Sequence, residues 1–344
     1  MLSKSRVLIG FDGFIDTLLY CVEKRLGPHS FKRLQSIPSF SQKVLAAASQ
    51  STNIECVVKG QSIGGNAPLL AQALASLGHT GTLVGACGYP DIHPIFHPLQ
   101  TAGLTVHSFA EPGITDALEF TDGKLLLGKM GELNHITLQE AQQRLPHTIL
   151  QSLIEQAQIL ATVNWTMMPM VQEFWEYLLV NKRLLKKGPK KTLFVDLADP
   201  AKRPVKDLKK GLSMLSELNC LCNVILGLNR AEARCVADAF HLSSSHSLNK
   251  NAEIIADSLQ LHSVIIHTHP EVAVATVHGD TMCSHALKVP VCKKPVRSTG
   301  AGDTFNAGFL AGVIQHQPPL ACLKMAVAAS NIFVRTGNPP TAML

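Results

Sequence analysis

Residues 297–309 read RSTGAGDTFNAGF, a glycine-rich loop that opens directly into an apolar helix predicted over Thr304–Ile314. The free N–H groups of a helix N-terminus and the helix macrodipole both favour an anion in front of the first turn. Glycines let the backbone approach a phosphate closely. Asp303 begins this helix, where it is either a simple N-cap or a carboxylate beside a phosphate site. The Gly-Ala-Gly loop in front of it favours the phosphate site.

Outside this loop, short runs rich in Val, Ile and Leu alternate with stretches of helical periodicity. This alternation predicts an α/β fold, with a central, mostly parallel sheet covered by helices on both faces. The predicted strands are 6–10, 54–58, 81–85, 104–108, 159–163, 192–196, 220–226 and 263–267, and the clearest helices are 67–77, 91–102, 171–187, 230–240 and 252–261.

One region interrupts the alternation. Residues 117–120 and 124–128 flank a turn that contains Asp122 and Gly123, which predicts a β-hairpin. A hairpin inside a parallel α/β chain usually belongs to an accessory sheet or lid. We therefore expect a single domain over residues 1–344, with a small lid that includes about residues 105–130.

Composition excludes several classes of protein. The 344 residues are 46% hydrophobic, which excludes a disordered chain. The net charge of +6 is scattered and aromatic residues make up 5%, so a nucleic-acid partner is disfavoured. Nine cysteines without a CxxC motif argue against a zinc ribbon or a disulfide framework, and no apolar run is long enough to span a membrane. These features predict a cytoplasmic protein with reduced cysteines.

Two nucleotide-binding motifs are missing. The chain has neither GxxxxGK[ST] nor a strand–GxGxxG–helix unit, which argues against a P-loop kinase and a nicotinamide enzyme. Acids follow the first strand instead, at Asp12 and Asp16. Ligands of open parallel sheets lie beyond the carboxyl ends of the strands, so these two carboxylates are candidates to accept hydrogen bonds from a ligand's hydroxyl groups.

The segment STGAGDTFNAGFLAG resembles the C-terminal signature of the ribokinase family, the PfkB-type carbohydrate kinases. Other stretches resemble the family's motifs in the family's order: Gly64-Gly65-Asn66-Ala67, the segment 85–91 (GACGYPD), Asn229-Arg230-Ala231-Glu232 and the closing helix 326–337. The chain departs from the family at Arg297-Ser298-Thr299, where Asp-Thr is usual, at Leu69, where Asn is usual, and at 267–273, where a Gly-rich turn beside the nucleotide is usual.

The resemblance implies a ribokinase-like three-layer sandwich and an ATP- and Mg²⁺-dependent kinase that phosphorylates a hydroxyl of a sugar or nucleoside. A non-catalytic binding protein with a decayed nucleotide site is the alternative. By resemblance, Asp303 is the general base, and the helix N-terminus should keep it ionised. The resemblance also implies an anion hole at Gly300, Ala301 and Gly302. It implies a nucleotide and Mg²⁺ site at Asn229 and Glu232, with Glu232 reaching the metal through water. The implied substrate site consists of Asp12, Asp16, Gly64, Gly65 and Asn66.

Some assignments stay open. Asn229 and Glu232 have the spacing of a capping box, in which the two side chains only close a helix start. Asp196 and Asp199 follow a predicted strand, and a structural role is favoured for both. His267 and His269 should alternate on one face of a strand, and without a third ligand a zinc site is disfavoured. Lids of the family often pair between subunits, so a homodimer through the lid is expected.

Overall fold

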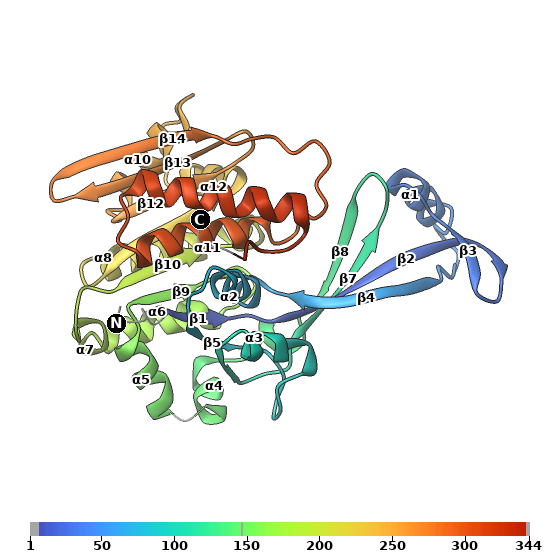
Figure 1. Cartoon of the computed structure of the whole chain (residues 1–344), viewed down its shortest axis with the longest axis horizontal. Helices are drawn as coiled ribbons and strands as arrows, with labels where there is room; N and C mark the ends of the chain where they lie inside the picture. Colours follow the sequence, from blue (N-terminus) through green and yellow to red (C-terminus); the bar gives the residue numbers. More distant parts are fainter. Residues whose placement is uncertain (1–6, 146, 342–344) are drawn as a thin grey trace.

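A nine-stranded sheet forms the centre of the computed structural model, which describes residues 7–145 and 147–341 (Figure 1). The strands from β6 to β12 are parallel, and β13 and β14 add antiparallel strands at one edge. The spatial order is β14 (Thr281–Lys288), β13 (Glu271–His278), β12 (Ser263–His267), β11 (Asn223–Asn229), β10 (Thr192–Asp196), β9 (Ile159–Thr162), β1 (Val7–Phe11), β5 (Gly81–Gly85) and β6 (Thr105–Ser108).

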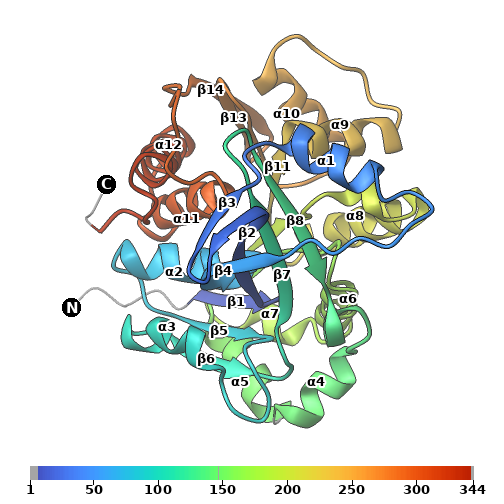
Figure 2. The same cartoon turned by 90° about the vertical axis from the view of Figure 1, so that its right-hand side faces the viewer.

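Helices cover both faces of this sheet, which confirms the expected three layers (Figure 2). One layer packs α2 (Asn66–Ser76), α3 (His97–Thr101), α11 (Ala301–Ile314) and α12 (Pro319–Thr336). The other layer packs α4 (Leu138–Arg144), α5 (His147–Gln156), α6 (Met170–Val180), α7 (Arg183–Lys186), α8 (Val205–Asn219), α9 (Arg230–Ala239) and α10 (Leu248–Ser258).

The strands are apolar on both faces because each face is buried. In β1, Leu8 joins the core beneath one helical layer, whereas Val7 and Ile9 join the core beneath the other. Successive strand side chains point to opposite faces, so a continuous apolar run is what a doubly covered sheet requires. Among the described residues, no helix has both the length and the apolar content to cross a bilayer.

A second sheet projects from the carboxyl ends of these strands and forms the lid (Figure 1). Its strands are β2 (Phe14–Gly27), β3 (Ser30–Arg33), β4 (Cys56–Gly64), β7 (Gly113–Glu119) and β8 (Lys124–Lys129), and α1 (Ile37–Leu45) packs at its outer end. The expected hairpin is therefore confirmed as β7 and β8. Besides this hairpin, the lid sheet contains β2, β3 and β4, whereas residues 105–108 of the expected range belong to β6 of the main sheet.

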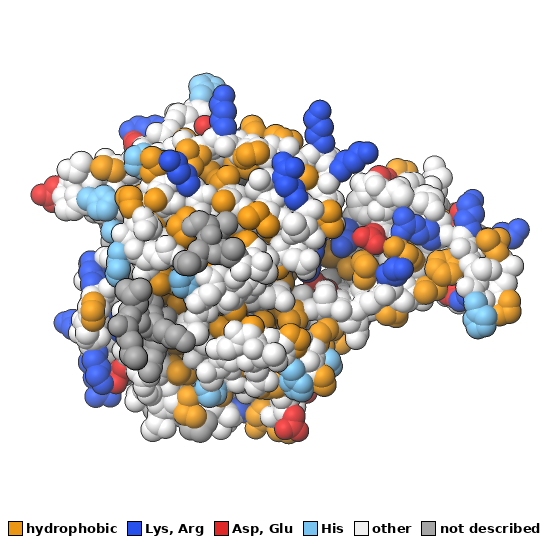
Figure 3. Space-filling view, viewed as in Figure 1, with side chains coloured by type: hydrophobic (Ala, Val, Ile, Leu, Met, Phe, Trp, Pro, Cys, Tyr) orange, Lys and Arg blue, Asp and Glu red, His pale blue; other side chains and the backbone are white. Residues whose placement is uncertain are grey.

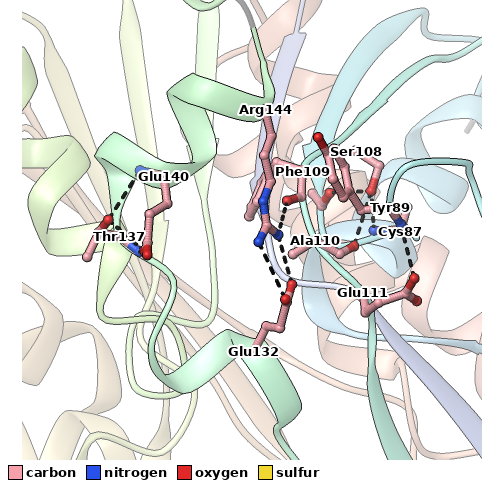
Figure 4. Close-up of polar contacts among 11 residues, drawn as sticks. Cys87, Tyr89, Ser108, Phe109, Ala110, Glu111, Glu132, Thr137, Glu140 and Arg144 are labelled. Carbon is pink, nitrogen blue, oxygen red and sulfur yellow. Dashed lines mark hydrogen bonds and ion pairs between the residues drawn. The ribbon is translucent and has the colours of Figure 1, made fainter.

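Arg144 holds together the two ends of the β7–β8 hairpin, where the hairpin leaves the main domain (Figure 4). Its guanidinium donates to the Phe109 carbonyl oxygen, which precedes β7, over 2.9 Å, and to the Glu132 carboxylate, which follows β8, over 2.9 Å. The same guanidinium stacks on the Tyr89 ring at 4.8 Å from its centroid. One side chain thus fixes the entry and the exit of the hairpin.

Four predicted elements differ from the observed ones. The predicted strand 54–58 is observed as β4, which begins at Cys56, runs to Gly64 and pairs with β2 in the lid instead of joining the main sheet. The predicted helix 91–102 is only a 3-10 turn, η1 (Pro94–Phe96), followed by α3, because prolines interrupt it. The predicted helix 171–187 is split into α6 and α7 at Asn181. The predicted strand 220–226 begins only at Asn223, after a turn that closes α8. Two further short 3-10 segments are η2 (Gly131–Asn134) and η3 (Pro200–Lys202).

Candidate active site

Three consecutive residues bring the predicted substrate and catalytic carboxylates together. Gly64, at the end of β4, lies against the Asp16 carboxylate, and Gly65 lies against that of Asp12. The Asn66 side chain donates to Asp303 Oδ1 over 2.9 Å. The segment 64–66 therefore joins the lid, the first strand of the main sheet and the N-terminus of α11. The sequence motifs predicted these residues individually but not the contacts between them.

Asp12 has a buried structural position. Its carboxylate accepts the backbone N–H groups of Asn66 and Ala67 over 2.9 and 2.7 Å, and the Asn164 side-chain amide over 2.6 Å. It thereby supplies the cap that the first turn of α2 lacks from its own N-cap residue, Gly65, whose φ is +89°. Asp12 is fully buried, and this burial raises its pKa. The contacts assign Asp12 to the positioning of Asn66.

Asp16 lies on the lid strand β2, opposite Ser62, and its carboxylate needs the space left by Gly64, two residues further along β4. A Cβ built on Gly64 would stand 2.3 Å from Asp16 Oδ1, closer than any real contact allows. Burial raises the pKa of Asp16, while a hydrogen bond from Thr115 and the charges of Arg297 and Lys124 act in the opposite direction. Asp16 is the more accessible of the two acids, so it is the better candidate to contact a ligand's hydroxyl group.

Asp303 occupies the first turn of α11, as predicted, but its ionisation differs from the prediction. Burial raises its pKa to about 7, and the nearby charge of Asp12 acts in the same direction. The hydrogen bond from Asn66 and the charge of Arg297 oppose this shift without cancelling it. The helix N-terminus was expected to keep Asp303 ionised, but desolvation outweighs the macrodipole in setting its pKa. A pKa near 7 suits a general base at neutral pH.

Not every backbone N–H group of the predicted anion hole is available to a ligand, because one already donates to a protein acceptor. Gly300 is the N-cap of α11 and has φ +93°, a conformation that glycine adopts without strain. The Ala301 N–H donates to the Ser298 carbonyl oxygen over 3.1 Å, so it already has an acceptor. In the described ranges the Gly302 N–H has no protein acceptor. Gly302 is therefore the residue of the loop best able to donate to an anion.

Asn229 and Glu232 form the capping box that their spacing allowed. The Glu232 N–H donates to Asn229 Oδ1 over 3.0 Å, and the Asn229 N–H donates to Glu232 Oε2 over 2.7 Å. The other carboxylate oxygen of Glu232 accepts the Asp199 N–H over 2.9 Å. Because both oxygens of Glu232 are occupied, direct metal ligation by this residue would break the cap. No group of three His, Cys, Asp or Glu side chains that could hold a metal occurs in residues 7–145 and 147–341.

Two buried asparagines beside the predicted site, Asn164 and Asn306, were not among the predicted site residues. Asp196, expected to be structural, is also buried and accepts the Asn306 amide over 2.8 Å. Burial, together with the charges of Glu232 and Asp303, raises its pKa well above the usual range. Asn164, after β9, donates to Asp12 and leaves its buried Oδ1 without a partner among the described residues. Asn306 is visible in the quoted loop and helix, whereas Asn164 carries no motif.

Arg297 stands where the resembled family usually has an acid or a threonine. Its guanidinium lies over the Phe333 ring of α12, 5.6 Å from the centroid. Phe333 in turn packs against the position of Gly300. The Arg297 charge reaches both Asp16 and Asp303, and within the described chain Arg297 forms no ion pair. The departure from the family motif thus places an unpaired cation beside the site.

A cavity of about 400 Å³ adjoins the backbone of Ala301 and Gly302. Its walls come from the ends of β11 and β12, from the turn that carries His269, and from α12. His267 ends β12 and packs on the Phe305 ring at 5.2 Å, while His269 lies beyond the strand, so the two do not share a strand face as predicted. The cavity exists although the segment 267–273 contains no glycine.

Comparison with known proteins matches this chain to one family along nearly its whole length. The model of the family described as prokaryotic ketohexokinase matches residues 1–343. A ketohexokinase of Haloferax volcanii is 28% identical over 346 residues, which cover 98% of this chain and 88% of the relative.

Solved structures agree with the fold. A carbohydrate kinase from Agrobacterium tumefaciens gives a TM-score of 0.65 at 18% identity, covering 98% of this chain and 93% of that structure. Ribokinase from Thermotoga maritima gives 0.63 at 17% identity, with 98% and 95% covered. Adenosine kinase from Schistosoma mansoni gives 0.66 at 18% identity, with 98% and 97% covered. The fold is ribokinase-like, and the chain belongs to the prokaryotic ketohexokinase family of PfkB-type sugar kinases.

Proposed function

We propose that this kinase transfers the γ-phosphoryl group of ATP to a hydroxyl of a ketohexose, with Asp303 as the general base. The observation that carries the proposal is the position of Asp303: it begins α11, accepts the Asn66 amide and has a pKa raised to about 7 by burial. Family membership supports a sugar as the acceptor and disfavours the alternatives of a nucleoside and of a decayed, non-catalytic binding protein.

In the proposed reaction, the sugar hydroxyl donates its proton to Asp303 while its oxygen forms a bond to the γ-phosphorus. The bond from that phosphorus to the bridging oxygen of ADP breaks, and ADP leaves with the electron pair. Asn66 is the only side chain among those described that donates to Asp303, and it occupies Oδ1, which leaves Oδ2 to accept the proton. The transition state of phosphoryl transfer is loose, so positioning and charge stabilisation dominate.

Two groups of the protein would stabilise the negative charge on the transferred phosphoryl group. The Gly302 N–H at the start of α11 can donate to a phosphoryl oxygen, as in other preorganised anion sites. Arg297, on the side of Phe333, offers a guanidinium without an ion-pair partner in the described structure. Asp16 would accept a hydrogen bond from a second hydroxyl of the sugar, and Gly64 provides the space for its carboxylate.

The cavity of about 400 Å³ is the proposed nucleotide site. Val272, Val289 and Phe305 supply apolar walls, and Ala301 and Gly302 line the side toward Asp303. Burial lowers the pKa of His267 to about 4, so His267 is uncharged at neutral pH, whereas Arg230 adds a cation to the lining. An apolar wall beside an anion site suits a purine base with a phosphate chain.

Mg²⁺ fits this site only as an ion held mainly by phosphate oxygens and water. Both carboxylate oxygens of Glu232 accept backbone N–H groups, so Glu232 would reach the ion through a water molecule. Asn229 would help to order that water. When bound, Mg²⁺ would neutralise part of the charge on the phosphates.

A homodimer through the lid is also proposed. Apolar side chains on the lid are exposed at Val58, Leu126 and Leu127, which expose 61%, 52% and 53% of their surface. Light scattering of wild type and of a Leu126→Lys/Leu127→Lys variant tests this. A dimeric wild type and a monomeric variant are expected, and a monomeric wild type at micromolar concentration would contradict the dimer.

The reaction itself is tested by a screen for ADP release from ATP and Mg²⁺ with ketohexoses, aldohexoses and nucleosides. We expect turnover with a ketohexose at a kcat/KM at least roughly tenfold above that for any aldohexose or nucleoside, since a site that binds hydroxyls by hydrogen bonds rejects mismatched ones strongly. Equal or faster turnover of a nucleoside would replace the proposed acceptor.

A further inference from the structure

A second cavity of about 430 Å³ lies at the opposite end of the main sheet from Asp303. The residues that line it include Ile159, Thr192, Asn223 and Ser263, each at or next to the N-terminal end of a strand, β9 to β12. Asp303 and Asp12 lie instead at the other end of the same layer. This cavity is therefore separate from the proposed active site.

The rim of the cavity carries Lys190, His262, His278 and His316, and its lining contains no Asp or Glu. Within the described part of the chain, none of these four side chains forms an ion pair. Figure 3 shows histidine side chains, with Lys or Arg and a few acidic side chains among them, along the left-hand flank of the main domain, the end where the strands begin. Lys190 is the cation of this rim, the three imidazoles can exchange hydrogen bonds with a ligand, and no acid of the lining opposes an anion.

The basic groups of the rim are close enough to repel one another. The rings of His262 and His278 lie 6.5 Å apart between their centroids. Burial, together with smaller contributions from the charges of Lys190 and His278, lowers the pKa of His262 to about 4. An anion placed between these side chains would remove that repulsion.

The floor of the cavity is apolar. Ile159, Ile225, Phe309 and Cys322 line it, and each exposes 4% or less of its surface. The last turn of α11 also reaches the cavity, but the carbonyl oxygens of Gly312 and Val313 already accept N–H groups, from Gln317 and His316. The negative end of this helix therefore presents few free acceptors to an anion.

An adjoining cavity of about 560 Å³ shares Lys190, Asn223, His262 and His278 with this one. Asp257 and Asp280 line that adjoining space, on the side away from the apolar floor. Lys190, His262 and His278 therefore line both spaces, one of which also contains Asp257 and Asp280 while the other has the apolar floor against α11.

We infer that the cavity bounded by Lys190, His262, His278 and His316 is a second binding site, which takes a small organic phosphate. The rim supplies a cation and several imidazole donors to the phosphate oxygens, and the floor supplies apolar surface to the organic part. The contacts do not involve Asp303 or the nucleotide cavity, so the site binds whether or not the proposed acceptor is correct.

Calorimetric titration with phenyl phosphate and with inorganic phosphate tests this site. Wild type is compared with Lys190→Gln/His278→Gln, two exposed positions, and with the matched control Lys206→Gln/His246→Gln, which removes the same charges from exposed positions outside the cavity. We expect phenyl phosphate to bind the cavity variant at least tenfold more weakly than it binds wild type and the control, and to bind wild type more tightly than inorganic phosphate does.

Identical phenyl phosphate isotherms for wild type and the cavity variant would overturn the proposal. Equal weakening in both variants would also overturn it, because a general loss of positive charge would then explain the result. Any binding at the active site is common to all three proteins and cancels in the comparison. If the double variant does not fold, His316→Gln alone, an exposed position on the same rim, must weaken phenyl phosphate binding, and an unchanged isotherm overturns the site.

Discussion

The Asn66 side-chain amide donates a hydrogen bond of 2.9 Å to Asp303 Oδ1, although 237 residues separate the two in sequence. This bond joins the first turns of α2 and α11, and Asp12 holds the α2 end of it by accepting the Asn66 N–H. The arrangement fixes one oxygen of the proposed base and partly offsets the increase in pKa that burial causes. Both properties can be tested.

Replacing Asn66 by Ala should shift the pH dependence of the reaction. The hydrogen bond from Asn66 lowers the pKa of Asp303, so its loss should raise that pKa above about 7. A base must be ionised to act, and the acid limb of kcat/KM should therefore move to higher pH in Asn66→Ala. Initial rates between pH 5 and 9 measure this. An acid limb at the same pH in both proteins would show that Asn66 does not influence the base.

The raised pKa of Asp303 also predicts a dependence of stability on pH. Between the unfolded pKa of 3.8 and the folded pKa of about 7, the folded protein binds more protons than the unfolded one, so Asp303 costs stability as the pH rises through 7. Asp303→Asn removes this cost. Thermal unfolding should give the variant a higher Tm than wild type at pH 8, and a smaller difference at pH 5. A variant less stable than wild type at pH 8 would contradict the direction of the shift.

Gly64→Ala should weaken acceptor binding through Asp16. The new Cβ would stand 2.3 Å from Asp16 Oδ1 and displace the carboxylate. The acceptor KM should rise by roughly tenfold to a hundredfold, since small misplacements of positioning groups have effects of this order. Gly60→Ala is the matched control, because it lies on the same strand and its Cβ would meet nothing within 4 Å. An equal effect of both variants on KM would assign the loss to the lid strand in general.

The Glu232→Gln variant tests whether Glu232 takes part in Mg²⁺ binding or only caps the start of α9. The carboxylate accepts two backbone N–H groups and an amide oxygen can replace only one acceptor, so unfolding should become easier by about 1–3 kcal/mol. The Mg²⁺ concentration for half-maximal rate should also rise. Glu140→Gln is the control, since Thr137 and Glu140 form a capping box at the start of α4 (Figure 4). A loss of stability with unchanged Mg²⁺ dependence in both variants would leave Glu232 a cap alone.

The main sheet and the start of α11 were predictable because their signals are local. Apolar runs such as that of β10 and the glycine loop before Asp303 depend on neighbours in sequence. The lid was not predictable in full, because β2 reads FIDTLLYCVEKRLG, where burial alternates over residues 15–21 but apolar and polar residue types do not, since Thr17 is buried and Leu18 is half-buried. Its partners β4 and β7 are distant in sequence, so their pairing is a tertiary property.

The candidate active site likewise has features that local sequence motifs predict and features that depend on tertiary contacts. Asp303 and Glu232 are recognisable from motifs, but the raised pKa of Asp303 results from burial beneath elements that the motif does not contain. Asp12 was predicted to bind substrate, and the structure shows its carboxylate accepting hydrogen bonds from the start of α2 and from Asn164, contacts that the motif did not reveal. A carboxylate after a strand suits either role, and only the position of the neighbouring helix decides between them.

The most direct test of the account is the rate of Asp303→Asn with a ketohexose, ATP and Mg²⁺, followed as ADP release. Asparagine preserves the size of the side chain and an oxygen for the Asn66 amide but cannot accept a proton at neutral pH. With the base removed, kcat should fall by roughly 10²–10⁴-fold while ATP and sugar still bind. A variant that phosphorylates the sugar at nearly the wild-type rate would contradict the assignment of Asp303 as the base.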